Sequence, residues 1–408
     1  MKVLLSAYAC EPGKGSELGV GWNVVWQVAK YHEVWVLTRP DEGRLAIEAE
    51  LARNPMPNLH FVYFTLPVWG DGWRRGQGAI QLHYYLWQIQ AYFVGRKLHR
   101  EIGFDVVHHV TFVKYSSPSF LSLLPVPFIW GPVGGGESAP KSFWQGFSLR
   151  GKVYETLRNL ARWLGEHDWF VQLTAQRCVL ALATTKDTAI RLQALKARQV
   201  DVIGQCGLSQ EEINYLGNFP IPPDFPMRFI SIGRLLHWKG FHLGLQAFAI
   251  AAPEQAEYWI IGDGPERERL QVLVNQLGIT PQVKFWGNLP RDEALLKLGE
   301  CHVLVHPSLH DSGGWVCLEA MAAGRPVLCL DLGGPATQVT EETGFKVPAH
   351  DPDQAVRHLA EAMTCLAHDP ELLSQRGQAG KKRVRQVYDW GVKGQCFAKL
   401  YEEVIARQ

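Results

Sequence analysis

The chain has 408 residues, of which 47% are hydrophobic and 20% are charged, and its formal net charge is +1. This length predicts two domains of about 150–200 residues, and the balanced charge excludes a polybasic protein that binds nucleic acid in bulk. Eight cysteines without CxxC spacing predict neither a zinc site nor a disulfide framework. With no signal-peptide pattern and no apolar run of about 18 residues, the expected location is the cytoplasm.

Short apolar segments alternate with helical patterns in the first half of the chain. The expected strands are Val3–Ala9, Glu33–Thr38, Leu59–Leu66, Asp105–Val110 and Phe128–Trp130. Strands that alternate with helices form a parallel sheet with helices on both faces. Residues 1–207 are therefore expected to form one doubly wound, Rossmann-like domain.

The alternation stops at the proline-rich segment 208–227, which indicates a linker, and restarts in a second domain over residues 228–385. Its expected strands are Phe229–Gly233, Tyr258–Ile261, Val283–Trp286, Val303–His306 and Val327–Leu330. The expected helices are Phe241–Ala251, Glu266–Leu277, Arg291–Gly299 and Trp315–Ala323. A last helix within residues 386–408 is expected to cross back to the first domain. Two such α/β domains would bind a ligand at the carboxyl ends of their strands, in the cleft between them.

The strongest motif covers residues 306–327 and predicts a strand, a turn of small residues, a helix, a glycine stop and a further strand. Gly313 and Gly314 allow the backbone to approach a ligand closely, and the helix that opens there directs free N–H groups outward. This arrangement suits a diphosphate. Asp311 and Glu319 lie eight positions apart, so both side chains can face the same opening.

This motif resembles family 4 of the retaining glycosyltransferases, which have the GT-B fold. Its members carry two acidic residues separated by seven positions, followed by Glu-Ala-Met-Ala-x-Gly-x-Pro-Val. The resemblance implies that Glu319 holds the ribose hydroxyls and that Asp311 holds a hydroxyl of the transferred sugar. The donor-binding backbone groups that it implies are those of Gly313, Gly314, Trp315 and Val316. Asp311 stands where the family usually has Glu, and Gly313 where it commonly has Phe, which leaves the identity of the donor sugar open.

A second motif places Gly233 at the end of a strand and then Arg234 and Lys239 five positions apart in a loop. Two cations at one point can neutralise the charge that grows on a departing nucleoside diphosphate. The family has a Gly-Arg-x(4)-Lys-Gly pattern here, so the resemblance implies that both side chains bind the diphosphate. Two weaker turns, at Gly264 and Leu289, correspond to family segments that border the donor and its base.

A glycine-rich loop in residues 13–21 joins a strand to a helix. A dinucleotide-binding fingerprint is one interpretation, but its third glycine is due where Leu18 stands. The family has a glycine-rich loop here that approaches the donor phosphates. The resemblance therefore assigns Gly15 and Ser16 to the donor and Glu17 to an acceptor contact.

Two adjacent histidines, His108 and His109, lie in the strand at 105–110. The family has a histidine near the reacting face of the sugar; His109 is preferred for this position, and the other ring is expected in the core. Gly134, Gly135 and Glu137 follow the next strand, either as an acceptor loop or, for the glycines, as a hinge.

Two further segments have both a structural and a functional interpretation. Asp351-Pro352-Asp353 is expected to start a helix, with Asp353 as its N-cap, rather than to bind a metal. Residues 151–173 predict an amphipathic helix, which either covers the sheet or docks on an anionic membrane. Its apolar face would carry Val153, Leu157, Leu160 and Leu164, and another face Arg158 and Arg162. Elsewhere in the first half, tryptophans fall in segments with basic residues, among them Trp69 and Trp73 with Arg74 and Arg75.

These features predict a retaining glycosyltransferase that moves a sugar from a UDP-, GDP- or ADP-linked donor to a glycan or lipid-linked acceptor. The product would be a cell-surface polysaccharide or glycolipid. No metal and no bound cofactor are expected, and the catalytic side chains would be His109 or His108, Asp311, Glu319, Arg234 and Lys239. Three alternatives stay open: a nucleotide-sugar epimerase of the same fold, a dinucleotide-dependent oxidoreductase, and an inactive glycan-binding protein.

Overall fold

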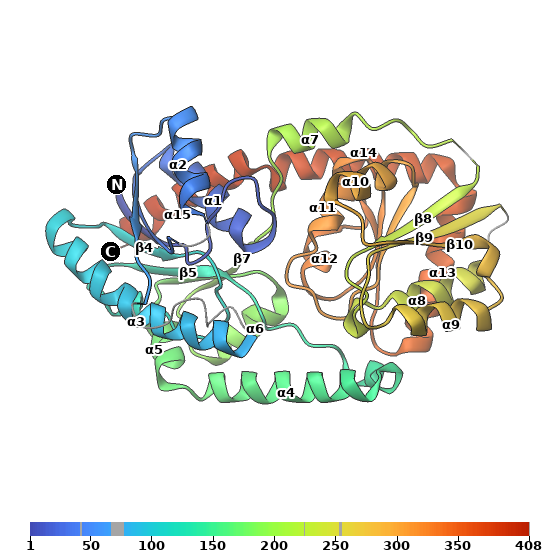
Figure 1. The fold of residues 1–408 in the computed structure, drawn as a ribbon, viewed down its shortest axis with the longest axis horizontal. Helices are drawn as coiled ribbons and strands as arrows, with labels where there is room; N and C mark the ends of the chain where they lie inside the picture. Colours follow the sequence, from blue (N-terminus) through green and yellow to red (C-terminus); the bar gives the residue numbers. More distant parts are fainter. Residues whose placement is uncertain (41–42, 67–76, 224, 253–254, 408) are drawn as a thin grey trace. The chain divides into compact units, whose positions relative to one another are not determined.

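The computed structural model describes residues 1–40, 43–66, 77–223, 225–252 and 255–407 (Figure 1). The residues Trp69, Trp73, Arg74 and Arg75, expected near a membrane, lie outside these ranges. Contacts divide the chain into unit 1 (Met1–Gly136, Arg158–Gln205 and Trp390–Gln408) and unit 2 (Glu137–Leu157 and Cys206–Asp389). The expected boundaries at 207 and 228 follow chain order, whereas in the structure residues 137–157 belong to unit 2 and the C-terminal helix belongs to unit 1.

In its described residues, unit 1 contains a seven-stranded parallel sheet in the order β3-β2-β1-β4-β5-β6-β7. The strands are β1 (Lys2–Ser6), β2 (Glu33–Thr38), β3 (Leu59–Tyr63), β4 (Val106–His109), β5 (Phe128–Val133), β6 (Leu180–Ala183) and β7 (Val200–Val202). Because most of these strands are buried on both faces, their sequences are continuous apolar runs. The strand order reverses between β1 and β4, so the loops that follow these two strands begin side by side.

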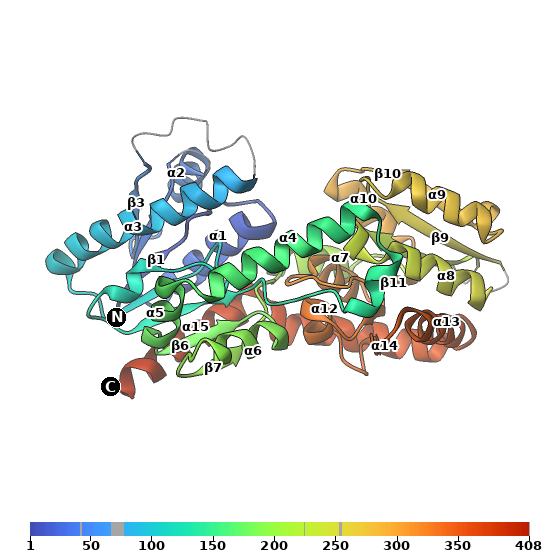
Figure 2. The same ribbon diagram turned by 90° about the horizontal axis from the view of Figure 1, so that it is seen from below.

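Helices cover both faces of this sheet (Figures 1 and 2). One face is buried by α3 (Gln77–Ile102), α5 (Trp169–Arg177) and α6 (Lys186–Ala194). On the other face, α1 (Ser16–Ala29) packs against α15 (Trp390–Ala406). The short helix α2 (Arg44–Arg53) links β2 to β3.

Unit 2 contains, in its described residues, a six-stranded parallel sheet in the order β10-β9-β8-β11-β12-β13. The strands are β8 (Met227–Ile232), β9 (Ala256–Ile261), β10 (Val283–Gly287), β11 (Val303–His306), β12 (Val327–Leu330) and β13 (Gly344–Val347). The order reverses between β8 and β11. The loops that carry Arg234 and Asp311 therefore begin side by side at the carboxyl edge of the sheet.

Successive residues of the unit 2 strands point into two different hydrophobic clusters, because side chains alternate between the faces of a sheet. Phe229, Tyr258 and Val303 pack with α8 (Phe241–Ala251), α9 (Arg267–Gln276) and α13 (Pro352–His368). Their neighbours Ile230, Trp259 and Leu304 pack with α7 (Gln210–Gly217), α10 (Arg291–Gly299) and α11 (Trp315–Ala322). Both faces are thus covered, as the continuous apolar strands predict.

The helix expected over residues 151–173 is wrong in extent, because the structure has two helices there. The first is α4 (Leu149–Glu166), and the second is α5. Asp168 separates them because its carboxylate accepts a hydrogen bond from the Phe170 backbone N–H and so caps α5. No described helix, α4 included, is long and apolar enough to cross a membrane.

Two other local expectations also differ from the structure. The expected linker 208–227 contains α7, whose N-terminus has a capping box between Ser209 and Glu212. The helix cap expected at Asp353 is instead Asp351, whose carboxylate accepts a hydrogen bond from a backbone N–H three residues later. In both places a polar side chain satisfies the first free N–H groups of the helix.

Candidate active site

The candidate site lies at the carboxyl edge of the unit 2 sheet, where the loops after β8 and β11 meet. Gly233 (φ +151°) follows β8. Further along this loop, the Trp238 carbonyl accepts a hydrogen bond of 2.7 Å from the Leu309 backbone N–H. A Cβ at Gly240 would lie 1.9 Å from the Pro307 carbonyl oxygen, so only glycine allows this approach. The backbone itself therefore joins the two motifs that the sequence separates by about 70 residues.

Lys239 and Asp311 form a short ion pair between these loops, with Nζ and Oδ2 2.5 Å apart. His306 Nε2 lies 3.3 Å from the same carboxylate oxygen. Burial alone would raise the pKa of Asp311, but the charge of Lys239 and the hydrogen bond of His306 outweigh it and hold that pKa well below its usual range. Asp311 is therefore an ionised carboxylate whose partner, an ammonium group, can be exchanged for the hydroxyl of a ligand.

Arg234 is exposed and makes no ion pair or hydrogen bond with any residue in the described part of the chain. Its guanidinium is thus available to an anionic ligand. The two weaker turns lie at the same edge of the sheet. Gly264 follows β9 (φ +159°) and packs closely on Leu235, and Leu289 follows β10 and is half-buried against the cluster that includes α10 and α11.

The opening of α11 has the geometry of an anion site. Gly314 precedes the helix in a left-handed conformation (φ +76°), and no side chain caps the helix N-terminus. The Gly313 N–H donates to Asp311 Oδ1 over 3.3 Å, and its carbonyl accepts from Gln338 Nε2 over 2.5 Å. The turn is therefore anchored, while the first N–H groups of the helix, in the segment Gly314–Val316, remain for a negatively charged ligand.

Glu319 lies one turn into α11 and is buried. Its Oε1 accepts hydrogen bonds from Arg291 Nη2 (2.7 Å) and Nε (3.1 Å), and Arg291 also donates to Glu212 (2.8 Å). Burial raises the pKa of Glu319, although the charge and hydrogen bond of Arg291 oppose the shift. The sequence interpretation missed Arg291 and Glu212. The Ser209-x-x-Glu212 spacing signals a helix start, but no spacing signals the contact with Arg291.

Glu137, which was expected to contact an acceptor, is buried in the structure. The side chain belongs to unit 2, is 2% exposed, and accepts a hydrogen bond of 2.6 Å from Ser312 Oγ. Gly134 lies in unit 1, where its N–H donates to the Val113 carbonyl (2.9 Å) in an ordered backbone pairing. Gly135 adopts φ +90°, which favours glycine. The backbone conformation of Gly135 and the backbone pairing of Gly134 thus give these positions a structural role. The buried carboxylate of Glu137 bonds to the loop that carries Asp311.

The glycine-rich loop of unit 1 lies at the edge where β1 and β4 end. Gly15 precedes α1 and Ser16 has φ +56°, and both are exposed. Glu17 accepts a hydrogen bond of 2.9 Å from the Phe112 backbone N–H, which follows β4. Burial raises the pKa of Glu17, while the Phe112 hydrogen bond and the charge of Lys114 oppose this shift.

The two histidines of β4 point to opposite faces of the sheet. Both nitrogens of His108 are engaged, by the Tyr401 hydroxyl (2.6 Å) and the Gly131 carbonyl (2.5 Å), so His108 is a core ring and not a ligand contact. His109 Nε2 lies 3.2 Å from the Tyr84 hydroxyl and 3.3 Å from Gln88 Nε2, both on α3. The geometry therefore leaves His109 as the better candidate.

These two buried rings predict a loss of stability in mild acid. Burial lowers the pKa of His108 to about 4 and, together with the charge of His108, that of His109 to about 3. In the unfolded chain, histidine binds a proton with a pKa near 6.5, whereas the folded rings stay neutral to lower pH. The free energy of unfolding is therefore fully retained above about pH 6.5 and falls towards pH 4, by up to about 1.4 kcal/mol per pH unit for each ring. Thermal unfolding measured from pH 7.5 to 5 tests this. His108→Gln, which does not titrate, should show a shallower pH dependence; an unchanged slope would contradict the assignment.

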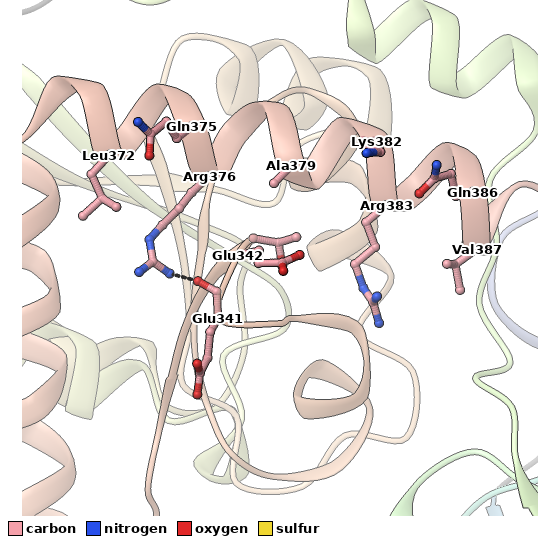
Figure 3. A pocket seen from close by; sticks show the side chains of 11 residues that line it. Glu341, Glu342, Leu372, Gln375, Arg376, Ala379, Lys382, Arg383, Gln386 and Val387 are labelled. Carbon is pink, nitrogen blue, oxygen red and sulfur yellow. Dashed lines mark hydrogen bonds between the residues drawn. The ribbon is translucent and has the colours of Figure 1, made fainter.

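A surface pocket of about 500 Å³ lies elsewhere in unit 2, along α14 (Pro370–Arg383) (Figure 3). Arg376, Lys382 and Arg383 line it together with Glu341 and Glu342, so its charge is mixed. None of the expected site residues lines this pocket. Separately, no three His, Cys, Asp or Glu side chains in the described ranges are grouped so that they could hold a metal ion.

Comparison with known proteins agrees with this geometry. Residues 221–383, which contain both unit 2 motifs, match the family described as Glycosyl transferases group 1. Lipopolysaccharide core biosynthesis glycosyltransferase LpsD of Rhizobium meliloti is 29% identical over 179 residues, which cover 44% of this chain and 50% of that protein. 2-Deoxystreptamine glucosyltransferase of Streptomyces kanamyceticus is 31% identical over 181 residues, 43% of this chain and 46% of that protein. The chain spans about half the length of the curated relatives it matches.

The fold is also that of a solved structure, HepE of Anabaena in complex with UDP. The TM-score is 0.62 at 18% identity, over 99% of this chain and 100% of that chain. The expected GT-B fold is thereby confirmed, with two doubly wound sheets. With this fold and this matching domain, the chain is similar to the group 1 glycosyl transferases over residues 221–383. The narrower assignment to the retaining family 4 stays a prediction.

Proposed function

We propose that the chain is a retaining glycosyltransferase whose unit 2 binds a nucleotide-diphosphate sugar and whose unit 1 binds a glycan or lipid-linked acceptor. One observation carries this proposal: the Lys239–Asp311 ion pair lies at the uncapped opening of α11, and Glu319 follows on the same helix. A cation, an anion-binding helix end and two carboxylates match the parts of a sugar nucleotide. The names of the relatives, and the UDP in the HepE structure, support the same substrate class.

In the proposed reaction, donor binding exchanges the partners of the ion pair. Lys239 and Arg234 bind the diphosphate, Asp311 accepts a hydrogen bond from a hydroxyl of the sugar, and Glu319 accepts hydrogen bonds from the ribose. The bond between the anomeric carbon and the phosphate oxygen breaks while the acceptor oxygen forms a bond on the same face. The proton of the acceptor hydroxyl passes to the departing phosphate. The two cations and the N–H groups of α11 stabilise the charge that develops there.

A donor panel tests the proposal. UDP, GDP and ADP are added to the full chain, and the shift of the unfolding temperature is measured for each. One nucleotide should raise it by roughly 5 °C at a hundredfold excess over its dissociation constant. The corresponding sugar nucleotide should then release that nucleotide in the presence of acceptor. No shift and no release with any of the three would refute the proposal.

The same assay separates the alternatives. An epimerase would convert the sugar nucleotide into another sugar nucleotide without an acceptor, and an oxidoreductase would be stabilised by a dinucleotide. An inactive glycan-binding protein would release no nucleotide. The anomeric configuration of the product, determined by NMR, tests retention.

We also propose that α4 docks on an anionic membrane, at the cytoplasmic face. The apolar face of this helix does not cover the sheet: Val153, Leu157, Leu160 and Leu164 are 51%, 60%, 51% and 56% exposed. Trp163, which is 53% exposed, adds an aromatic side chain of the type found at membrane interfaces. The exposed Arg150 and Lys152 provide charge complementarity. Cysteines that are all free are consistent with a reducing compartment.

Vesicle flotation tests this docking. The wild-type chain should float with vesicles that contain phosphatidylglycerol and stay below those of phosphatidylcholine alone. Leu157→Asp combined with Leu160→Asp should abolish flotation, because two charges would enter the apolar face. Leu296→Asp, at a leucine of α10 that is 52% exposed, is the matched control and should float like the wild type. Equal flotation of all three proteins, or none at low salt, would exclude the docking.

A further inference from the structure

A buried carboxylate of α4 bonds to both loops of the candidate site, the loop after β8 and the loop after β11. It is not itself one of the expected site residues. Glu155 is 1% exposed, and its Oε1 lies 3.1 Å from His237 Nε2 and 2.9 Å from His310 Nε2. Glu155, His237 and His310 all belong to unit 2. One carboxylate oxygen thus bonds two imidazoles that are 73 positions apart in the sequence.

Stacked rings reinforce this contact. The Trp238 ring stacks on both Tyr154 of α4 (5.0 Å, 13°) and His310 (5.1 Å, 17°). At Gly151, one turn earlier in α4, a Cβ would lie 3.1 Å from the His237 ring. The first turns of α4 are therefore packed directly on both loops, and the contact is specific in shape as well as in charge.

The positions of the two histidines in the chain connect this contact to the candidate site. His237 belongs to the short 3-10 turn His237–Lys239, which ends with the cation of the candidate site. His310 directly precedes Asp311, the anion of the same site. A shift of either imidazole therefore moves Lys239 or Asp311 with it, because one or two peptide units separate them. The hydrogen bond from Leu309 to Trp238 completes a closed ring of contacts.

We propose that Glu155 is a positioning residue for the donor site, acting through His237 and His310 on Lys239 and Asp311. This inference rests on the proposed function. It assigns to α4 a second role besides its exposed apolar face: its buried face fixes the spacing of the two charged groups that meet the donor. Displacement of such groups by about 1 Å lowers turnover on the order of 100-fold.

A double-mutant cycle tests the inference. Glu155→Ala should weaken binding of the nucleotide identified by the donor panel, and lower kcat/KM, by about tenfold to 100-fold. In the Lys239→Ala background the same change should have less than a threefold further effect, since the group that Glu155 positions is gone. Glu155→Gln, which keeps the shape and one hydrogen bond, should recover most of the binding. If Glu155→Ala does not fold, Glu155→Leu, which fills the volume but makes no hydrogen bond, is the test variant.

A matched control separates positioning from stability. Glu257→Ala removes another ion-paired carboxylate of unit 2, which contacts Lys284 (2.7 Å), and should lower the unfolding temperature without changing nucleotide affinity. If Glu155→Ala, or Glu155→Leu in its place, binds nucleotide like the wild type, or if its effect is fully independent of Lys239, the inference is wrong. If the wild type itself binds none of the three nucleotides, the proposed function fails instead.

Discussion

Replacing Lys239 with alanine is expected to lower kcat/KM for sugar transfer by a factor on the order of 100 to 1,000, the loss typical of removing one group that stabilises developing charge. The ammonium group lies between the loops, 2.5 Å from Asp311, and in the proposed reaction it moves to the departing diphosphate. Its loss also removes the charge that keeps the pKa of Asp311 low. Initial rates at varied donor concentration measure the effect, which should be largest in kcat.

Two companion variants are needed to interpret the result for Lys239→Ala. Arg234→Ala should cause a smaller loss, about 10-fold to 100-fold, because the guanidinium is exposed and its interaction with the diphosphate is partly screened by water. Lys297→Ala removes a lysine of α10 that pairs with Glu300 (2.8 Å), directly after that helix, and it should leave kcat/KM unchanged. Lys239→Ala activity within twofold of the wild type would show that the diphosphate is bound elsewhere.

Replacing Glu319 with alanine is expected to raise the KM for the donor by about 10-fold to 100-fold with a smaller change in kcat. Hydrogen bonds to a charged group are worth about 1.5–3 kcal/mol, and the ribose hydroxyls make theirs in ground state and transition state alike. The fold should tolerate the change, because Arg291 keeps its ion pair with Glu212 (2.8 Å).

The ribose assignment has its own control. UDP lacking both ribose hydroxyls should bind the wild type more weakly than UDP does, but Glu319→Ala should not distinguish the two nucleotides. If the chain prefers GDP or ADP to UDP, the comparison uses that nucleotide with and without its two ribose hydroxyls. Glu212→Gln changes the other carboxylate on Arg291 and should leave this discrimination intact. Discrimination that survives in Glu319→Ala would place the ribose at another group.

The sequence was sufficient for the architecture of both units because alternating strands and helices leave a strong periodic signal. It also identified the loops after β8 and β11, because the carboxyl ends of adjacent parallel strands meet wherever the strand order reverses. The pairing of Lys239 with Asp311 follows from that topology. Arg291 was not found, since its partner Glu319 is 28 positions away and no periodicity links them.

Segment 137–157 shows a different limit of sequence analysis. The amphipathic pattern of α4 predicts an apolar face, but not whether a sheet covers it, and the exposed Leu157 and Leu160 show that none does. The sequence does not indicate that either Glu137 or Glu155 is buried; Glu137 was expected to contact an acceptor, and no motif includes Glu155. Both are buried against loops of unit 2, because the chain leaves unit 1 at Gly136 and returns only at Arg158. The passage of the chain from unit 1 to unit 2 and back depends on contacts between distant segments. Local sequence propensities carry no information about such contacts.

A crystal structure of the chain with the nucleoside diphosphate selected by the donor panel is the most direct test of the account. It should show the diphosphate within hydrogen-bond distance of Lys239 Nζ and of the N–H groups that open α11, with the ribose on Glu319. Lys239 should have left Asp311. A nucleotide bound away from α11, with the Lys239–Asp311 pair intact, would contradict the account.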